Sequence, residues 1–263
     1  PIVTTLHGTD ITLVGSHPFY RPAVTFSINH SDRVTAVSES LKQDTLRLFD
    51  ITTKIDVITN FIDIKKIEAK EMPCKRDLLA PKSDKIITHI SNFRPLKRIQ
   101  DVIKIFEKIS SSVSSKLLMV GEGPEKQKAV DYVKEKGLTE SISFLGNSNE
   151  IDKILCYSDL FLLPSEKESF GLSALEAMAN KVPVISSNAG GIPEVNKDNF
   201  SGYLSDVGDL DGMAKNALLL LQDDIKLEQF KEQAKEQASL FDIDAIISQY
   251  ETVYSEAIAS NQF

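Results

Sequence analysis

From residue 84 onward, short apolar runs that end in Gly, Ser or Asn alternate with stretches of helical periodicity. This alternation constrains the fold more than any other feature, because it is the pattern of βαβ units with parallel strands. We therefore predict an α/β domain with a doubly wound sheet, whose ligand lies beyond the carboxyl ends of the strands. The expected strands are residues 86–90, 116–120, 142–145, 160–163, 184–186 and 203–204. The expected helices are residues 99–110, 125–136, 150–156, 170–180 and 210–221.

A shorter unit of the same kind precedes residue 84. Strands are expected at residues 2–6, 33–37 and 55–58, and Ser38 can cap a helix after the second of them. Three strands make a thin sheet, and the chain opens at Pro1 with a strand already under way. We therefore expect the start of this first domain to be missing.

The remaining segments connect and close the two units. A charged, irregular stretch is typical of an interdomain connection, and an amphipathic helix is expected near the end of the chain, packing back toward the first domain. The predicted division is residues 1–60 for the acceptor-side domain, 61–83 for the connection, 84–240 for the ligand-binding domain and 241–263 for the C-terminal helix.

Composition excludes several classes of function. The formal net charge is −8, and so acidic a chain is a poor general binder of nucleic acid, which needs Lys and Arg against phosphates. The two cysteines and four histidines indicate neither a disulfide framework nor a metal cluster, so we expect a reducing cytoplasm, no metal and no cofactor. No apolar run approaches the roughly 20 residues of a membrane span.

The most informative stretch is residues 163–178, where a strand ends, an acidic loop with Glu168 follows and a helix begins near Gly171. Free backbone N–H groups at such a helix start can hold a phosphate. Glu176 lies inside this otherwise small and apolar helix, where an unpaired carboxylate is costly. Ribose hydroxyls are suitable partners for it. The alternative is that Glu168 and Glu176 are solvated surface acids, in which case the spacing between them has no functional significance.

Cations gather just past the first strand of the larger domain. Arg94, Lys97 and Arg98 follow residues 86–90, where a doubly wound fold places its ligand. A leaving diphosphate gains charge as its bond to a sugar breaks, and cations aimed at it stabilise that state. Taken alone, the cluster would fit a solvated helix start.

Three glycine turns also follow predicted strands, at residues 121–125, 144–147 and 188–194. The first is not G-x-G-x-x-G, which disfavours an NAD-dependent dehydrogenase. Each turn alone would fit a tight connection of no further function.

In this order, the motifs resemble those of the retaining glycosyltransferases of family four, which have the GT-B fold. Glu168 and Glu176, with seven residues between them, resemble the E-x7-E element of that family. The resemblance covers essentially the whole chain and implies two Rossmann-like doubly wound domains, the first incomplete. One position departs from the pattern: Asn92 stands where the family has an Arg, whereas Lys97 matches the family Lys five residues later.

The resemblance implies roles for individual residues. Glu168 would lie beside the donor sugar, Glu176 would bind the nucleotide ribose, and Arg94 with Lys97 would clamp the diphosphate. His7 would hydrogen-bond the donor sugar, so the implied catalytic residues are His7, Lys97 and Glu168. Further donor contacts are expected at Gly146, Asn147, Phe170, Gly171 and Leu172.

The runs at residues 5–13, 32–38 and 60–62 favour the branch of the family that acts in bacillithiol biosynthesis. The implied reaction moves N-acetylglucosamine from UDP-N-acetylglucosamine to L-malate with the α configuration retained. Two alternatives stay open: a family-four transferase with another donor or acceptor, in polysaccharide or glycolipid synthesis, and a non-catalytic sugar-nucleotide-binding fragment. A homo-oligomer is also left open.

A dianionic acceptor such as malate needs a fixed cation in so acidic a protein. Before residue 40 the cations are Arg21 and Arg33, and Arg33 opens a predicted strand beside Val34, where it should face solvent. Arg21 is therefore the expected ligand of the malate carboxylates, through the bidentate fork of its guanidinium, and Thr9 could add a hydrogen bond. A surface Arg at a helix start is the alternative.

Overall fold

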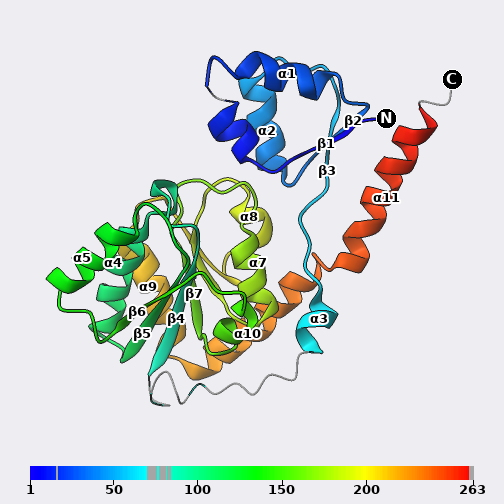
Figure 1. Cartoon of the computed structure of the whole chain (residues 1–263). Helices are drawn as coiled ribbons and strands as arrows, with labels where there is room; N and C mark the ends of the chain where they lie inside the picture. The colour runs from blue at the N-terminus through cyan, green and yellow to red at the C-terminus, as the bar shows by residue number, and fades with distance from the viewer. Residues whose placement is uncertain (16, 70–75, 77–80, 82–83, 261–263) are drawn as a thin grey trace.

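The computed structural model describes residues 1–15, 17–69, 76, 81 and 84–260, and it contains two parallel β-sheets (Figure 1). The smaller sheet has the order β1-β2-β3, with strands Val3–Leu6, Arg33–Ala36 and Ile55–Val57. The larger sheet has the order β6-β5-β4-β7-β8-β9. Its strands, in chain order from β4, are Lys85–Ile90, Ser115–Val120, Ile142–Gly146, Leu160–Leu163, Val184–Ser187 and Gly202–Ser205. The predicted strands are all confirmed, with no end shifted by more than one residue.

The strand order of the larger sheet fixes where a ligand can lie. Winding proceeds outward from β4 to β6, returns to β7 beside β4, and proceeds outward again to β9. Strands β4 and β7 are paired in parallel, with Ile87 opposite Leu160 and Thr88 opposite Phe161. The loops after these two strands diverge to opposite faces of the sheet, and a crevice opens between them at the carboxyl edge.

Helices cover both faces of the larger sheet (Figure 1). The helix α4 shows why: Ile99, Val102, Ile103 and Phe106 recur at helical spacing, and all of them are buried. One face is covered by α4 (Ile99–Ser110), α5 (Lys126–Glu135) and α9 (Leu210–Leu221), and the other by α6 (Ile151–Cys156) and α7 (Leu172–Ala179). These five predicted helices are confirmed. The short helix α8 (Ile192–Val195) and the longer α10 (Asp224–Ser239) were not predicted.

The first sheet carries the helices α1 (Arg21–Asn29) and α2 (Glu39–Leu48), preceded by a short π-helical turn, η1 (Asp10–Val14). The predicted cap of α2 is confirmed, because Ser38 Oγ accepts a hydrogen bond from the Leu41 amide at 3.0 Å. The start of the 61–83 stretch forms the short helix α3 (Ile64–Glu68), and most of its remainder lies outside the described residues.

The helix α11 (Ile243–Ala259) runs beside the first sheet, as Figure 1 shows. Its residues Ile246 and Val253 are buried in one cluster with Ile58, and the Tyr250 hydroxyl donates to the Ile58 carbonyl at 3.3 Å. The sequence-predicted C-terminal helix is thus confirmed. Within the described part of the chain, no helix is long and apolar enough to cross a membrane.

Candidate active site

The loops that follow β4 and β7 bring two charged side chains together. Lys97 ends the short 3₁₀ turn η3 (Pro95–Lys97), and its Nζ lies 2.5 Å from Oε1 of Glu168, which lies in the loop after β7. Ser165 Oγ donates to the same carboxylate oxygen at 2.9 Å, and the Glu166 amide donates to the Leu96 carbonyl at 2.8 Å. The two loops are therefore tied together at the edge of the sheet where a ligand is expected.

The start of α7 provides a second group of polar atoms. Gly171 precedes the helix in a left-handed conformation (φ 100°), which turns the chain sharply from the Glu168 loop into the first helical turn. Glu176 lies one turn further along, and burial, reinforced by the charge of Asp152, raises the pKa of its carboxyl above the ordinary 4.5. Among the described residues, no hydrogen bond or ion pair of this carboxylate is found, so it is available to a ligand.

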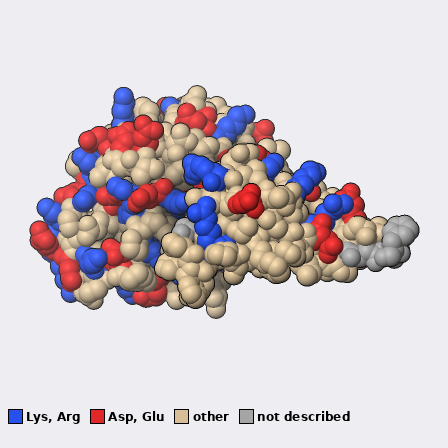
Figure 2. Space-filling model, turned by 90° about the horizontal axis from the view of Figure 1, so that it is seen from above, with Lys and Arg blue, Asp and Glu red and all other residues tan. Residues whose placement is uncertain are grey.

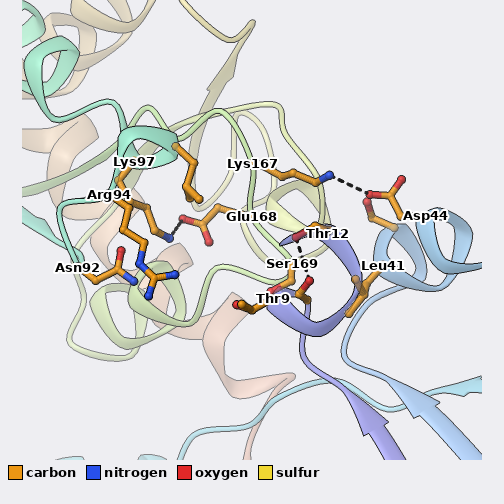
Figure 3. Close-up of a pocket in the computed structure, with 13 residues that line it drawn as sticks. Thr9, Thr12, Leu41, Asp44, Asn92, Arg94, Lys97, Lys167, Glu168 and Ser169 are labelled. Atoms are coloured by element: carbon orange, nitrogen blue, oxygen red, sulfur yellow. Dashed lines mark hydrogen bonds and ion pairs between the residues drawn. The ribbon is translucent and has the colours of Figure 1, made fainter. Parts of the chain in front are cut away.

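Two cavities meet at these loops. The helix-start cavity, of about 420 Å³, lies at the beginning of α7 and includes Glu176. The interdomain cavity, of about 120 Å³, lies between the two sheets and includes Thr9 and Thr12 (Figure 3). Only the larger reaches the roughly 300–1,000 Å³ of a typical small-molecule site. Their shared lining residues are Asn92, Lys97, Glu168 and Ser169.

Ser169 is also the point where the first domain touches the second. Its carbonyl accepts a hydrogen bond from Ser38 Oγ at 2.6 Å. A Cβ at Gly8 would lie 2.5 Å from the Ser169 Cβ, so only glycine allows this approach. On the same side, Lys167 Nζ points toward Asp44 of α2 at 3.9 Å, beyond hydrogen-bond distance (Figure 3). The interdomain cavity therefore has one wall from each domain.

Comparison with known proteins decides the family. Residues 74–237 match the family described as "Glycosyl transferases group 1", and residues 1–66 match the one described as "Glycosyltransferase Family 4". The chain belongs to the group 1 glycosyl transferases. The family predicted from the sequence motifs is confirmed.

Individual relatives agree with this assignment. N-acetyl-alpha-D-glucosaminyl L-malate synthase of Bacillus anthracis is 44% identical over 263 residues, which is 99% of this chain and 69% of that protein. Poly(ribitol-phosphate) alpha-N-acetylglucosaminyltransferase of Staphylococcus aureus (strain COL) is 30% identical over 213 residues, 79% of this chain and 40% of that protein. The chain thus spans only part of the length of each relative.

A solved structure gives the same fold. The crystal structure of a mutant of S. aureus TarM, in complex with fondaparinux, alpha-GlcNAc-glycerol and UDP, has a TM-score of 0.81 at 25% identity. The match covers 96% of this chain and 50% of that one. The fold of this glycosyltransferase is therefore of the GT-B type, as the sequence predicts.

The structure brings most of the predicted donor residues of this glycosyltransferase together. Lys97 and Glu168 line both cavities, and the exposed Arg94 lines the interdomain cavity beside Lys97 (Figure 3). Gly171, Leu172 and Glu176 line the helix-start cavity. Phe170 lines it too, but its ring is buried in the core, 5.7 Å from that of Phe241.

Other predicted residues lie further away. Gly146 ends the edge strand β6 and Asn147 follows it. Both lie at the carboxyl edge of the sheet, but they line neither cavity. His7 lies in a separate cavity against α11, with Tyr250 and Tyr254; this cavity shares Asn60 with the helix-start cavity. Their predicted roles stay predictions.

Arg21 is not brought to the interdomain cavity, whereas Thr9 is. Arg21 begins α1, its guanidinium donates to the Leu48 carbonyl at the end of α2, and it lies 5.7 Å from the centre of the Phe49 ring. In this geometry Arg21 joins α1 to the end of α2. Its role as acceptor ligand therefore gains no support from the structure.

Sequence reasoning missed three polar residues of the site. Ser165 holds Glu168, Lys167 lines the interdomain cavity, and Ser38 hydrogen-bonds Ser169 at the domain boundary. Lys167 could have been found, because it adjoins Glu168 and adds a cation to the acidic loop. Within the described residues, no group of three or more His, Cys, Asp or Glu side chains could hold a metal ion.

Proposed function

We propose that this glycosyltransferase moves N-acetylglucosamine from UDP-N-acetylglucosamine to L-malate with the α configuration retained. The observation that carries the proposal is the meeting of a larger and a smaller cavity at Lys97 and Glu168. A donor in the larger cavity and an acceptor in the smaller one would bring their reacting atoms together at that boundary. The similarity of 99% of this chain to an N-acetyl-alpha-D-glucosaminyl L-malate synthase and the UDP in the TarM structure support the two substrates.

The donor site would use groups whose chemistry matches a nucleotide sugar. The carboxylate of Glu176 would accept hydrogen bonds from the ribose hydroxyls, and the first amides of α7 with Lys97 would face the diphosphate. Arg94, which lines the interdomain cavity beside Lys97, would complete the clamp from that side. Gly146 and Asn147 remain the proposed neighbours of the base, and His7 the proposed partner of the sugar. Each of these contacts is directional, so together they orient the donor before reaction.

The acceptor site would lie in the interdomain cavity. The residues with hydroxyl groups in its lining are Thr9, Thr12, Ser40 and Ser169, and its size suits a four-carbon acid better than a polymer segment. Arg21 is the cation predicted from sequence for the malate carboxylates, and Lys167, which lines this cavity, is the alternative. The Michaelis constant for malate in Arg21→Ala and Lys167→Ala decides between them.

The chemistry follows from this placement. The bond between the sugar C1 and the β-phosphate oxygen breaks, the malate hydroxyl oxygen bonds to C1 on the same face, and its proton passes to the departing phosphate. Lys97 stabilises the charge that develops on the diphosphate, and Glu168 holds the Lys97 ammonium in place at 2.5 Å. The side chains contribute orientation and electrostatics and form no covalent intermediate.

The test measures UDP release and product mass with UDP-N-acetylglucosamine and a set of acceptors. L-malate should give stoichiometric UDP and N-acetylglucosaminyl malate, while succinate, which lacks the hydroxyl, should give neither. A product only with poly(ribitol phosphate) would favour a polymer-modifying transferase, as in the relative of that name. Binding of UDP without transfer to any acceptor would favour the non-catalytic alternative.

Two further expectations concern the whole protein. A cytoplasmic location and a homo-oligomeric state remain predictions, to be tested by fractionation and by light scattering. On the face shown in Figure 2, Lys and Arg side chains are interspersed with Asp and Glu. That nucleic acid is not a partner remains a prediction from the net charge.

A further inference from the structure

The carboxylate of Glu194 caps a helix of the other domain. Glu194 lies on the short helix α8 (Ile192–Val195) of the larger domain, after the glycine turn at residues 190–191. Its Oε2 accepts a hydrogen bond from the Glu39 amide and its Oε1 one from the Ser40 amide, both at 2.8 Å. These two amides open α2, and more than 150 residues separate them from Glu194.

The contact has the chemistry of a strong cap. The free amides at a helix start carry partial positive charge, so an anion is favoured there. Both carboxylate oxygens of Glu194 accept a hydrogen bond from such an amide. Ser38 Oγ completes the first turn by accepting from the Leu41 amide, and its own hydroxyl donates to Ser169. The first three amides of α2 are therefore satisfied, two of them by the larger domain.

The same contact sets the shape of the interdomain cavity. Ser40, whose amide binds Glu194, lines that cavity together with Leu41 and Asp44 of the same helix. The opposite wall contains Glu168, whose carbonyl accepts from the Gly191 amide at 3.0 Å. The segment that carries Glu194 thus holds both the α2 wall and the Glu168 loop.

We propose that Glu194 is a positioning residue for glycosyl transfer: by capping α2 across the domain boundary, it keeps the acceptor wall at a fixed distance from Lys97 and Glu168. The inference rests on the proposed function for its effect on turnover, whereas the cap itself is a property of the fold. Binding of UDP does not depend on it, because the groups proposed to bind UDP all belong to the larger domain.

The experiment compares Glu194→Gln and Glu194→Ala with the unchanged chain. Gln keeps the shape of the side chain but replaces one accepting oxygen by an NH₂ group, so the fold should survive. We expect faster hydrogen exchange at the Glu39 and Ser40 amides and an unchanged dissociation constant for UDP. The value of kcat/KM for malate should fall roughly 10- to 100-fold, as for other small misplacements of reacting groups.

Asp223→Ala is the matched control. Asp223 caps α10 by accepting from the Lys226 amide at 3.0 Å, a carboxylate cap contained within the larger domain. The substitution Asp223→Ala should lower the stability of the protein and leave kcat/KM for malate unchanged. An equal loss of kcat/KM in this control, or unchanged kcat/KM in Glu194→Gln, would overturn the positioning role. If the unchanged chain transfers nothing to malate, the proposed function fails; unchanged exchange at Glu39 and Ser40 in Glu194→Gln would then overturn the cap as well.

Discussion

The Lys97 ammonium has more donors than its partner carboxylate uses. Its Nζ contacts Glu168 Oε1, and the exposed fractions of the two side chains are 17% and 10%. An ammonium group carries three N–H donors, so Lys97 can hold Glu168 and still donate to a phosphate oxygen. Because both side chains are largely shielded from water, the positive charge of Lys97 acts on a bound diphosphate with little screening.

Lys97→Ala should therefore lower turnover by about 10²–10³-fold, the usual loss when one charge-stabilising group is removed from a transition state. The ratio of rates with different UDP-sugars should stay the same, because the diphosphate carries no information about the sugar. Steady-state kinetics with two donors measures both quantities. Lys153→Ala removes a solvent-exposed lysine paired with Glu150 and should leave turnover unchanged. Near-normal turnover in Lys97→Ala would remove Lys97 from the clamp.

His89 on β4 is a buried imidazole that adjoins the site. The Leu162 carbonyl can only accept, so Nδ1 donates to it at 2.8 Å, and Nε2 accepts from Ser91 Oγ at 2.8 Å. Burial, with a smaller contribution from the positive charge of Lys97, lowers the pKa of His89 from 6.5 to about 4. The native state therefore holds His89 neutral, with Ser91 of the β4 loop fixed against it.

This lowered pKa predicts a loss of stability in acid. Between pH 6.5 and about 4 the unfolded chain binds a proton at this histidine and the native chain does not, so the free energy of unfolding falls as the pH falls. The contribution of His89 amounts to about 3 kcal/mol over that window. Urea unfolding at several pH values measures this contribution. In His89→Gln the free energy of unfolding should change less with pH. A native imidazole that titrates near pH 6.5 by NMR would contradict it.

At the scale of elements, the sequence predicted those helices and strands whose periodicity is carried by large side chains. Most strands of the larger sheet contain a short apolar run, and α4 has a continuous stripe of Ile, Val and Phe. The helix α10 was missed because its stretch is mostly polar, and of its buried residues only Leu227 and Phe230 are large and apolar. Its remaining buried stripe consists mainly of alanine, which gives little pattern to detect.

The glycine turn after β8 supports the Glu168 loop, and this predicts a specific defect. Gly190 has a φ of +56°, and a Cβ there would lie 1.9 Å from the Glu168 carbonyl oxygen. Gly190→Ala should thus add overpacking of about 1–3 kcal/mol to the backbone strain, displace Glu168 and lower turnover. Gly137→Ala is the control, because its φ is +68° but nothing lies within 4 Å of the added carbon. It should show only the strain of about 1 kcal/mol, with full turnover.

Urea unfolding and donor turnover distinguish the two glycine variants. Equal losses of stability in both, with full turnover in Gly190→Ala, would show that the Glu168 loop can move away without consequence. In that case the turn would serve the fold alone.

At the scale of the whole molecule, topology joins residues that the sequence separates widely. Lys97 and Glu168 were expected in the site because their motifs resemble those of the family, and the switch of winding between β4 and β7 brings them together. The contacts between domains were beyond sequence reasoning, because the approach of α2 to α8 depends on how two separately folded sheets pack. For the same reason Arg21, selected by charge alone, joins α1 to the end of α2 instead of lining the cavity.

The most direct test of the site is a calorimetric titration of this chain with UDP, repeated on Glu176→Ala. The chain should bind UDP at one site, and Glu176→Ala should bind it more weakly by about 1–3 kcal/mol, the loss expected for hydrogen bonds to a charged group. Glu228→Ala, which removes an exposed glutamate from α10, should bind like the unchanged chain. No binding of UDP, or equal affinity in the unchanged chain and Glu176→Ala, would contradict the placement of the donor at the start of α7.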